Sequence, residues 1–495
     1  MSESLLPVVI RHAGKTHNVS VDLNEPGILF KSQIFSLTNV PPERQKVLVK
    51  GGQLKDDTDL KTLNLKPNQS IMVLGTPDST GIPQKPKEKI VFLEDLEKQG
   101  KLTEFSADPL GFQNLGNTCY LNSTLQALNN VDELKGALQK YEGNDALVKE
   151  LKQTFQRLQK GKISGNGRYI IPLSLLNSLR SIFPQFAEQD NHGYKQQDAE
   201  ECFSQILSNL KSTLPNDFVD KYFGLRFKTY QKCQENDPED QEVIGYDEGM
   251  KLSCHININT NFLKTGLSEG TKDIITKHNP HFSRDANYVI ERKITRLPKY
   301  LTVHFVRFYW KREIRAKAKI LRKVAFPFQL DVTDLLDESV KPTNIKTRDE
   351  IYKVEKEKED EFKEQRRAKK MKPSEDRSRL LLSSKEKFEL EEKEFQENEK
   401  KWLGEFSKVF PEDLGEGEAP SPLYDLVSVI THKGASADSG HYQAFTRNEK
   451  DLTGNSWWYF NDDKVLNVTK DKIESLAGGG ESDNALILIY KASGL

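Results

Sequence analysis

A single stretch, GFQNLGNTCYLNSTLQAL at residues 111–128, constrains this chain more than any other. Its first half, through Asn117, is rich in Asn and Gly, which favour tight or left-handed backbone. Its second half places leucines four and three residues apart, which gives one apolar face of a helix. Thr118 is a good N-cap, so Cys119 is expected in the first helical turn, where the positive helix end favours the nucleophilic thiolate. A buried structural thiol is the alternative, but core thiols rarely follow such a polar, glycine-rich loop.

Two later segments supply the partners that a nucleophilic thiol needs. His441 follows a loop rich in Ser and Gly and opens the aromatic run HYQAF. Asn461 ends the aromatic strand WWYFN, 20 residues later (461 − 441 = 20). We expect a hairpin that sets the Asn461 carboxamide across from His441, because an Asn or Asp there fixes the tautomer of the imidazole. The sequence leaves open whether Asn461 or Asp462 contacts the ring. Cys119 lies 322 residues before His441 (441 − 119 = 322), so only the fold can join them.

The composition narrows the class of protein. A length of 495 residues predicts two or three domains with ample core. The net charge of −1 gives no overall field that would attract nucleic acid or an anionic membrane. Four cysteines suggest no disulfide framework and therefore a reducing compartment. The sequence has neither an apolar run of about 18 residues nor the pattern of a secretory signal at its start. We therefore expect a protein of the cytoplasm and nucleus, and we expect neither nucleic acid nor a membrane as its partner.

The N-terminal region, residues 6–75, reads as two strands, a helix and two further strands. This order, and the segment PPERQKVLVKGGQLKDDTDL, resemble ubiquitin, which implies a β-grasp domain over residues 1–76. The chain continues past Gly75 without a terminal Gly-Gly, so we interpret the domain as a docking head and not a conjugation tag. Matching it onto the apolar recognition patch of ubiquitin puts Leu48 and Leu74 on an exposed face, with His12 nearby. The alternative is that both leucines belong to the core.

The cysteine and histidine segments resemble the two signature boxes of the ubiquitin-specific cysteine proteases. Further family landmarks are YKQQDAEECF, RLPKYLTVHFVRF and NALILIYK, so the resemblance covers residues 106–491. It implies a papain-like fold with a helical thumb and a β-sheet palm and fingers, which makes the whole chain α+β. With its ubiquitin-like head, the chain resembles the proteasome-associated members of the family. The partners implied are ubiquitin, polyubiquitinated proteins and the proteasome regulatory particle.

The resemblance implies thiol-dependent hydrolysis of isopeptide bonds at the C-terminal glycine of ubiquitin. Cys119 is then the nucleophile, and His441 is the base that pairs with it. The Cys119 N–H and the Asn114 carboxamide are the expected donors to the oxyanion. Asn461 takes the third triad place, where many relatives carry Asp. No organic cofactor is expected.

The resemblance also implies which residues hold the C-terminal tail of ubiquitin. Family members line that channel with an acidic helix, which corresponds here to Gln197, Asp198 and Glu201. Asp198 and Glu201 share a helix face, and a carboxylate pairs well with a tail arginine. A solvated helix face is the alternative. Gly440 and Tyr442, which flank the catalytic histidine, complete the expected tail contacts.

Many relatives build a zinc ribbon in their fingers from two Cys-x-x-Cys knuckles. This chain has only Cys233 and Cys254 in that region, one for each knuckle, with His255 adjacent. Structural zinc needs four ligands, and these residues are too few. We therefore predict fingers without metal, held by strand pairing and packing.

The remaining segments divide the chain. Residues 77–105, with several prolines between polar residues, read as a linker before a catalytic domain at 106–493. Within that domain, 340–415 is a charged insertion without a sustained apolar stripe, which predicts exposed helix or disorder. The resemblance to family members with a ubiquitin-like head implies that the aromatic and basic loop 308–322 and the loop 432–440 cover the tail channel in the free enzyme. The small, polar residues of 432–440 suit a movable lid, so we expect both loops to move when a partner binds.

A binding protein is the rival class. In that reading, the chain is a ubiquitin-like adaptor whose protease fold regulates the proteasome without cutting. Intact Cys119, His441 and Asn114 favour an active enzyme instead. The sequence gives neither the preferred ubiquitin linkage nor the degree of autoinhibition.

Overall fold

The computed structural model describes residues 5–38, 40–50, 52–75, 108–164, 169–191, 193–235, 242–311, 316–371, 384–436, 439–451, 453–480 and 482–495. The chain divides into two compact units, the first within 1–102 and the second within 103–495. The predicted linker 77–105 lies outside the described residues. None of the described helices combines the length and the apolar character needed to cross a bilayer.

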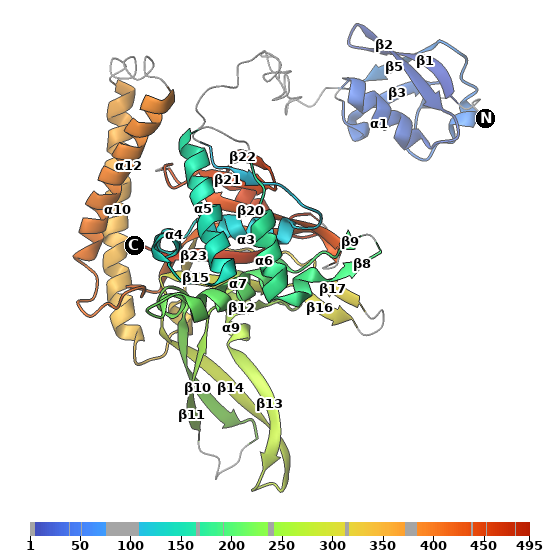
Figure 1. Ribbon diagram of the computed structural model, residues 1–495. Helices are drawn as coiled ribbons and strands as arrows, with labels where there is room; N and C mark the ends of the chain where they lie inside the picture. Colours follow the sequence, from blue (N-terminus) through green and yellow to red (C-terminus); the bar gives the residue numbers. More distant parts are fainter. Residues whose placement is uncertain are drawn as a thin grey trace. The chain divides into compact units, whose positions relative to one another are not determined.

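The described part of the first unit has a five-stranded sheet and one α-helix (Figure 1). Its elements are β1 (Leu5–His12), β2 (Lys15–Asp22), α1 (Gly27–Thr38), β3 (Lys46–Val49), β4 (Gly52–Gln53) and β5 (Gln69–Leu74). The strand order is β2-β1-β5-β3-β4, and β1 and β5 run parallel. Phe30 and Ile34 of α1 pack on Ile10 and Ile71 of the sheet. The predicted β-grasp order is confirmed, with the short β4 as an addition.

A group of helices forms the thumb of the second unit: α3 (Cys119–Asn129), α4 (Asp132–Lys140), α5 (Ala146–Ser164), α6 (Leu173–Ile182), α7 (Ala199–Thr213) and α8 (Phe218–Phe223). The central helix is α3, which is buried at every residue from Cys119 to Leu128. It packs against β19 and β20 of the palm. The thumb therefore presents the start of α3 directly to the sheet.

The palm is an eight-stranded sheet with the order β12-β15-β23-β19-β20-β21-β22, and β18 pairs with β19 beside this path. Its strands are β12 (Leu252–His255), β15 (Tyr300–Val306), β18 (Gln329–Asp331), β19 (Leu423–Ser436), β20 (Ser439–Arg447), β21 (Ser456–Asn461), β22 (Lys464–Thr469) and β23 (Asn484–Ala492). One core lies between thumb and palm, and a second packs on the palm with α9 (Leu263–Gly270) and α13 (Lys470–Ser475). The palm brings segments distant in sequence together.

The fingers are a four-stranded antiparallel sheet that extends away from the helices (Figure 1). Its order is β11 (Val243–Gly249), β10 (Leu225–Cys233), β14 (Arg284–Arg296) and β13 (Lys272–Asn279). Cys233 lies in a small cluster with Ala286 and Tyr288, whereas Cys254 lies in the palm core. The part of the chain that the structure describes holds no group of three or more His, Cys, Asp or Glu suited to a metal ion.

The charged insertion at 340–415 is largely exposed helix where the structure describes it, which is one of its two predicted states, but its apolar pattern was underestimated. It contains two long helices, α10 (Lys341–Met371) and α12 (Ser384–Ser407), which lie side by side (Figure 1). The expected absence of an apolar stripe is wrong, because a small core joins the helices through Ile351, Val354, Phe362, Trp402 and Phe406. The stripe was missed because its few members are shared between two segments and separated by dense charge.

Short strand pairs complete the second unit. They are β6 (Gly111–Phe112) with β7 (Tyr169–Ile170), β8 (Gln189–Asp190) with β9 (Gly193–Tyr194), and β16 (Phe308–Lys311) with β17 (Ala316–Lys319). The last pair corrects the expectation of an irregular loop at 308–322, because its described residues begin with an antiparallel hairpin. Aromatic residues at its start favour strand, and this preference outweighs the basic composition.

Candidate active site

The predicted nucleophile lies at the start of the central helix. Cys119 is the first residue of α3 and is only 2% exposed. Gly116 and Asn117 have positive φ, of 93° and 52°, as expected for the tight approach loop. Thr118 occupies the N-cap position but makes no side-chain cap bond; its Oγ1 instead accepts from the Leu115 N–H at 2.9 Å. The sequence predicted the position of the thiol correctly, but the side-chain capping bond expected from Thr118 is wrong.

The palm carries His441 and Asn461 to the thiol on neighbouring strands. Strands β20 and β21 pair antiparallel, as the predicted hairpin requires. His441 Nε2 lies 2.6 Å from Asn461 Oδ1, which leaves Nδ1 for the sulfur. A hydrogen bond to Cys119 raises the pKa of His441 to about 9 against the lowering effect of burial, and the Asn461 bond adds to the rise. The arrangement favours a protonated imidazole beside the thiol.

Two further donors point at the sulfur. The Tyr442 N–H lies 3.4 Å from Cys119 Sγ, and the Gln196 Nε2 lies 3.2 Å from it. Both can stabilise negative charge on the sulfur. The sequence analysis did not identify Gln196 as a site residue. Its position directly before Gln197 in the QQDA segment could have indicated it.

Asp462 connects the thumb to the palm. Its Oδ2 accepts from Asn114 Nδ2 at 2.9 Å, and its Oδ1 accepts from Asn122 Nδ2 at 2.8 Å. Its backbone carbonyl accepts from the Phe112 N–H at 2.9 Å. Its Oδ2 is 3.8 Å from His441 Nε2, so Asn461 makes the direct bond to the ring and Asp462 holds the loop before Cys119. Asn122 was not foreseen.

Asn114 is held in place from both ends of its amide. Its Oδ1 accepts from the Gly116 N–H at 2.9 Å, and its Nδ2 donates to Asp462. The side chain is exposed on the approach loop. Because an amide nitrogen carries two hydrogens, one remains for a further acceptor.

The predicted acidic helix begins later than expected. Helix α7 starts at Ala199, and Asp198 is its N-cap, with a carboxylate oxygen that accepts from the Glu200 N–H at 2.8 Å. Glu201 lies in the first turn of the helix and, like Gln197, is half-buried. Asp198 therefore has a structural task in addition to the tail contact predicted for it.

Gly440 and Tyr442 flank His441 on β20. Gly440 has φ 136°, and a Cβ there would come within 2.6 Å of His432 Nε2. The Tyr442 ring is 1% exposed and lies 4.8 Å from the His432 ring. In this structure, burial excludes the Tyr442 ring from the expected substrate contact, and the Tyr442 N–H is directed at the Cys119 sulfur.

The ubiquitin-like domain presents an apolar patch. Leu48 and Leu74 are 44% and 48% exposed, which contradicts the alternative that both are core. Met72, directly across from Leu48 in the sheet, is 52% exposed and extends the patch. His12 is buried, and its Nε2 lies 2.9 Å from the Gly75 carbonyl, so it supports the strand end.

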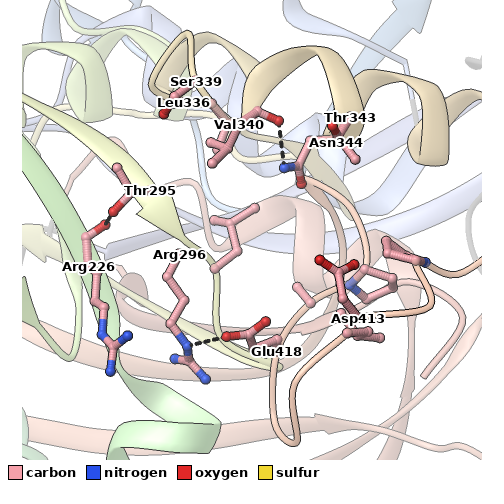
Figure 2. Close-up of a pocket in the computed structure, with 15 residues that line it drawn as sticks. Arg226, Thr295, Arg296, Leu336, Ser339, Val340, Thr343, Asn344, Asp413 and Glu418 are labelled. Atoms are coloured by element: carbon pink, nitrogen blue, oxygen red, sulfur yellow. Dashed lines mark hydrogen bonds and ion pairs between the residues drawn. The ribbon is translucent and has the colours of Figure 1, made fainter.

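A separate hollow of about 440 Å³ lies between the base of the fingers and the start of α10 (Figure 2). It contains none of the predicted catalytic or tail-binding residues. Arg296, in this hollow, donates to Glu418 Oε1 at 2.8 Å and to the carbonyls of Asp220 and Gly224 at 2.9 and 2.7 Å. This arginine joins the fingers to the thumb.

Comparison with known proteins agrees with this geometry. The ubiquitin carboxyl-terminal hydrolase family matches residues 110–490, and the ubiquitin family matches residues 8–78. The chain is 41% identical to ubiquitin carboxyl-terminal hydrolase 6 of Schizosaccharomyces pombe, over 99% of each chain. It is 38% identical to ubiquitin carboxyl-terminal hydrolase 7 of Arabidopsis thaliana, over 96% of each chain. It is 33% identical to ubiquitin carboxyl-terminal hydrolase 14 of Caenorhabditis elegans, over 98% of this chain and 94% of the relative.

These matches confirm the predicted family, the α+β fold and the enzyme class. They extend over nearly the whole of each relative, so both units are shared with them. The chain therefore belongs to the ubiquitin carboxyl-terminal hydrolase family and is a cysteine-type deubiquitinase with an N-terminal ubiquitin-like domain.

Proposed function

We propose that this deubiquitinase cleaves the isopeptide bond at the C-terminal glycine of ubiquitin, with Cys119 as nucleophile and His441 as base. One observation carries the proposal: the hydrogen bond to the Cys119 thiol is the main cause that raises the pKa of His441 to about 9. Such a pair favours thiolate and imidazolium, the reactive state of a thiol protease. Asn461 holds the ring for this task through its 2.6 Å bond to Nε2.

The reaction proceeds in two stages. The thiolate attacks the carbonyl carbon, and His441 gives its proton to the leaving lysine amine, so a thioester forms on Cys119. Water then attacks the thioester while the neutral His441 removes its proton. The products are ubiquitin with a free carboxylate and the regenerated thiol.

Both stages pass through a tetrahedral oxyanion that needs fixed donors. The Cys119 N–H and the second hydrogen of the Asn114 amide are the proposed donors. Asp462 holds Asn114 at 2.9 Å, and this bond preorganises the amide before substrate arrives. The oxyanion hole is therefore formed by the loop that precedes Cys119, and Asp462 of the palm holds this loop in place.

We propose that Gln197, Asp198 and Glu201 receive the basic tail of ubiquitin. Because Asp198 uses one oxygen to cap α7, Glu201 is the less constrained carboxylate for a tail arginine. Gly440 and Tyr442, on either side of the histidine, remain the other proposed tail contacts. The expected opening of 308–322 and 432–440 on partner binding remains part of this proposal.

We further propose that the ubiquitin-like domain binds the proteasome regulatory particle, where the enzyme trims polyubiquitinated proteins in the cytoplasm and nucleus. Leu48, Met72 and Leu74 support this role, because adjacent large apolar side chains on one sheet face are typical of a binding surface. Tethering by this domain would raise the local concentration of enzyme near its substrates.

Turnover of a ubiquitin C-terminal fluorophore, with and without purified proteasomes, tests the chemistry. Cys119→Ala and His441→Ala should abolish turnover in both settings. Co-sedimentation tests the docking: the double variant Leu48→Asp with Leu74→Asp should keep the activity of the isolated enzyme but lose proteasome binding. Leu29→Asp is the matched control, because Leu29 is equally exposed on α1. Turnover by Cys119→Ala would refute the chemistry, and co-sedimentation of the double variant would refute the docking.

A further inference from the structure

Lys319 is a buried cation outside the reacting groups. It ends β17 and is 7% exposed. Its Nζ donates to the carbonyls of His432 at 2.7 Å and of Gly434 at 3.0 Å. Burial lowers the pKa of Lys319 to about 8, and the neighbouring Arg307 adds to this effect. A buried ammonium held by carbonyls is costly to keep, which favours a specific task for it.

The two carbonyls belong to the end of β19 that supports the catalytic strand. In the β19–β20 ladder, His432 is paired with Tyr442 and Lys433 with His441, and the register becomes irregular after this pair. On its other side, β20 pairs with β21 only from Ala444 onward. Within the described residues, the end of β19 is thus the strand segment that pairs with β20 at His441.

The hairpin that carries Lys319 is firmly fixed at its base. Arg307, which is fully buried, donates to the carbonyls of Ala485, Ile320 and Arg322 at 2.8, 3.1 and 2.8 Å. The Ile320 N–H donates back to the Arg307 carbonyl at 2.7 Å. Lys319, one residue before Ile320, therefore extends from a rigid support.

A second contact, between aromatic rings, also connects the β16–β17 pair to the residues around the Cys119 thiol. Phe308, paired with Lys319 across the hairpin, lies edge-on to the His432 ring at 5.2 Å. The His432 ring in turn packs on Tyr442 at 4.8 Å, and the Tyr442 N–H lies 3.4 Å from Cys119 Sγ. The hairpin thus holds His432 by its backbone and by its ring.

We propose that Lys319 is a positioning residue for hydrolysis: by holding the end of β19, its ammonium keeps His441 and the Tyr442 N–H in place against the thiol. Lys319 touches neither the sulfur nor the imidazole, so it acts through the strand. The inference rests on the chemistry proposed above. It adds that the paired ends of β16 and β17, at Phe308 and Lys319, are a working part of the site that stays in place when the rest of 308–322 and 432–440 opens, and not only a cover over the tail.

Lys319→Met tests this, because Met keeps the length of the side chain and removes its donors and its charge. Lys323→Met is the matched control, since Lys323 is an exposed lysine on the segment that follows the hairpin. We expect Lys319→Met to lower kcat for ubiquitin–fluorophore about 10- to 100-fold, as small misplacements of reacting groups do. KM should change by less than about twofold, and the control should match the unaltered enzyme.

Two readouts separate positioning from general damage. In a Cys119→Ala background, Lys319→Met should bind ubiquitin as tightly as its parent. With the thiol present, NMR of labelled histidine should show the pKa of His441 shifted from about 9 toward its ordinary value near 6.5. Unchanged kcat, an unmoved His441 titration, or a parallel loss of ubiquitin binding would each overturn the proposal. Failure of the thiol chemistry itself would appear separately, as turnover that persists in Cys119→Ala.

Discussion

Replacing Asn461 and Asp462 separately by alanine tests how the catalytic histidine and the oxyanion hole are held. Asn461 contributes one hydrogen bond, 2.6 Å long, to His441 Nε2. A hydrogen bond to a charged group contributes about 1.5–3 kcal/mol, and 1.36 kcal/mol corresponds to a tenfold change in rate. We therefore expect Asn461→Ala to lower kcat about 10- to 150-fold.

Asp462 acts on the other side of the site. Its carboxylate accepts from Asn114 at 2.9 Å and from Asn122 at 2.8 Å. Asp462→Ala frees the Asn114 amide, and loss of one oxyanion donor typically costs about 10²–10³ in kcat. Although Asp462 is not the residue that bonds the ring, its variant should be the slower of the two.

Single-turnover hydrolysis of ubiquitin–fluorophore with excess enzyme isolates the chemical step from product release. Asp463→Ala is the control, because it removes an exposed carboxylate at the next position of the same turn. An Asn461→Ala variant as slow as His441→Ala would refute the reasoning. So would an Asp462→Ala variant that keeps the rate of the unaltered enzyme.

Four further predictions address pH and stability. Because the pKa of His441 is raised to about 9, kcat/KM should fall as the pH rises through 9, where the ring loses the proton that the leaving amine needs; a profile flat to pH 10 would contradict this. The stability that the raised pKa of His441 contributes should be full below about pH 6.5 and disappear as the pH rises through 9. Burial and the nearby Asp425 raise the pKa of Glu355 to about 7. The stability that protonated Glu355 contributes is therefore full below pH 4.5 and is lost as the pH rises through 7. Glu355→Gln should therefore raise the free energy of unfolding in urea by about 1–3 kcal/mol at pH 8 but not at pH 4, and equal effects at both would count against it. Trp402→Ala should cost about 3–5 kcal/mol of stability by opening the core between α10 and α12, with ubiquitin turnover kept; an unchanged melting temperature would show that this core contributes nothing.

The positions of Cys119, His441 and Asn461 in the fold could be predicted from sequence because local signals encode each of them. An Asn- and Gly-rich turn before a helical pattern placed Cys119 at a helix start, and the structure begins α3 there. An aromatic hairpin pattern placed Asn461 opposite His441, and the structure joins them at 2.6 Å. In each case the decisive information lies in one short segment, the longer of which runs from His441 to Asn461.

The supporting residues could not be predicted in the same way. The bonds from Asp462 to Asn114 and Asn122 join positions 348 and 340 residues apart, and no local spacing encodes them. Lys319 lies in the aromatic and basic loop that was predicted to cover the tail channel, and no local pattern indicated that two backbone carbonyls hold it inside the fold. The burial of the Tyr442 ring could not be predicted either, because sequence does not tell which face of a strand is covered.

Labelling with ubiquitin that carries a C-terminal electrophile, followed by peptide mapping of the adduct, tests the central claim most directly. We predict one adduct, on the Cys119 sulfur, that is absent in Cys119→Ala and forms much more slowly in His441→Ala. An adduct on Cys202, Cys233 or Cys254, or undiminished labelling of Cys119→Ala, would contradict the assignment of the nucleophile.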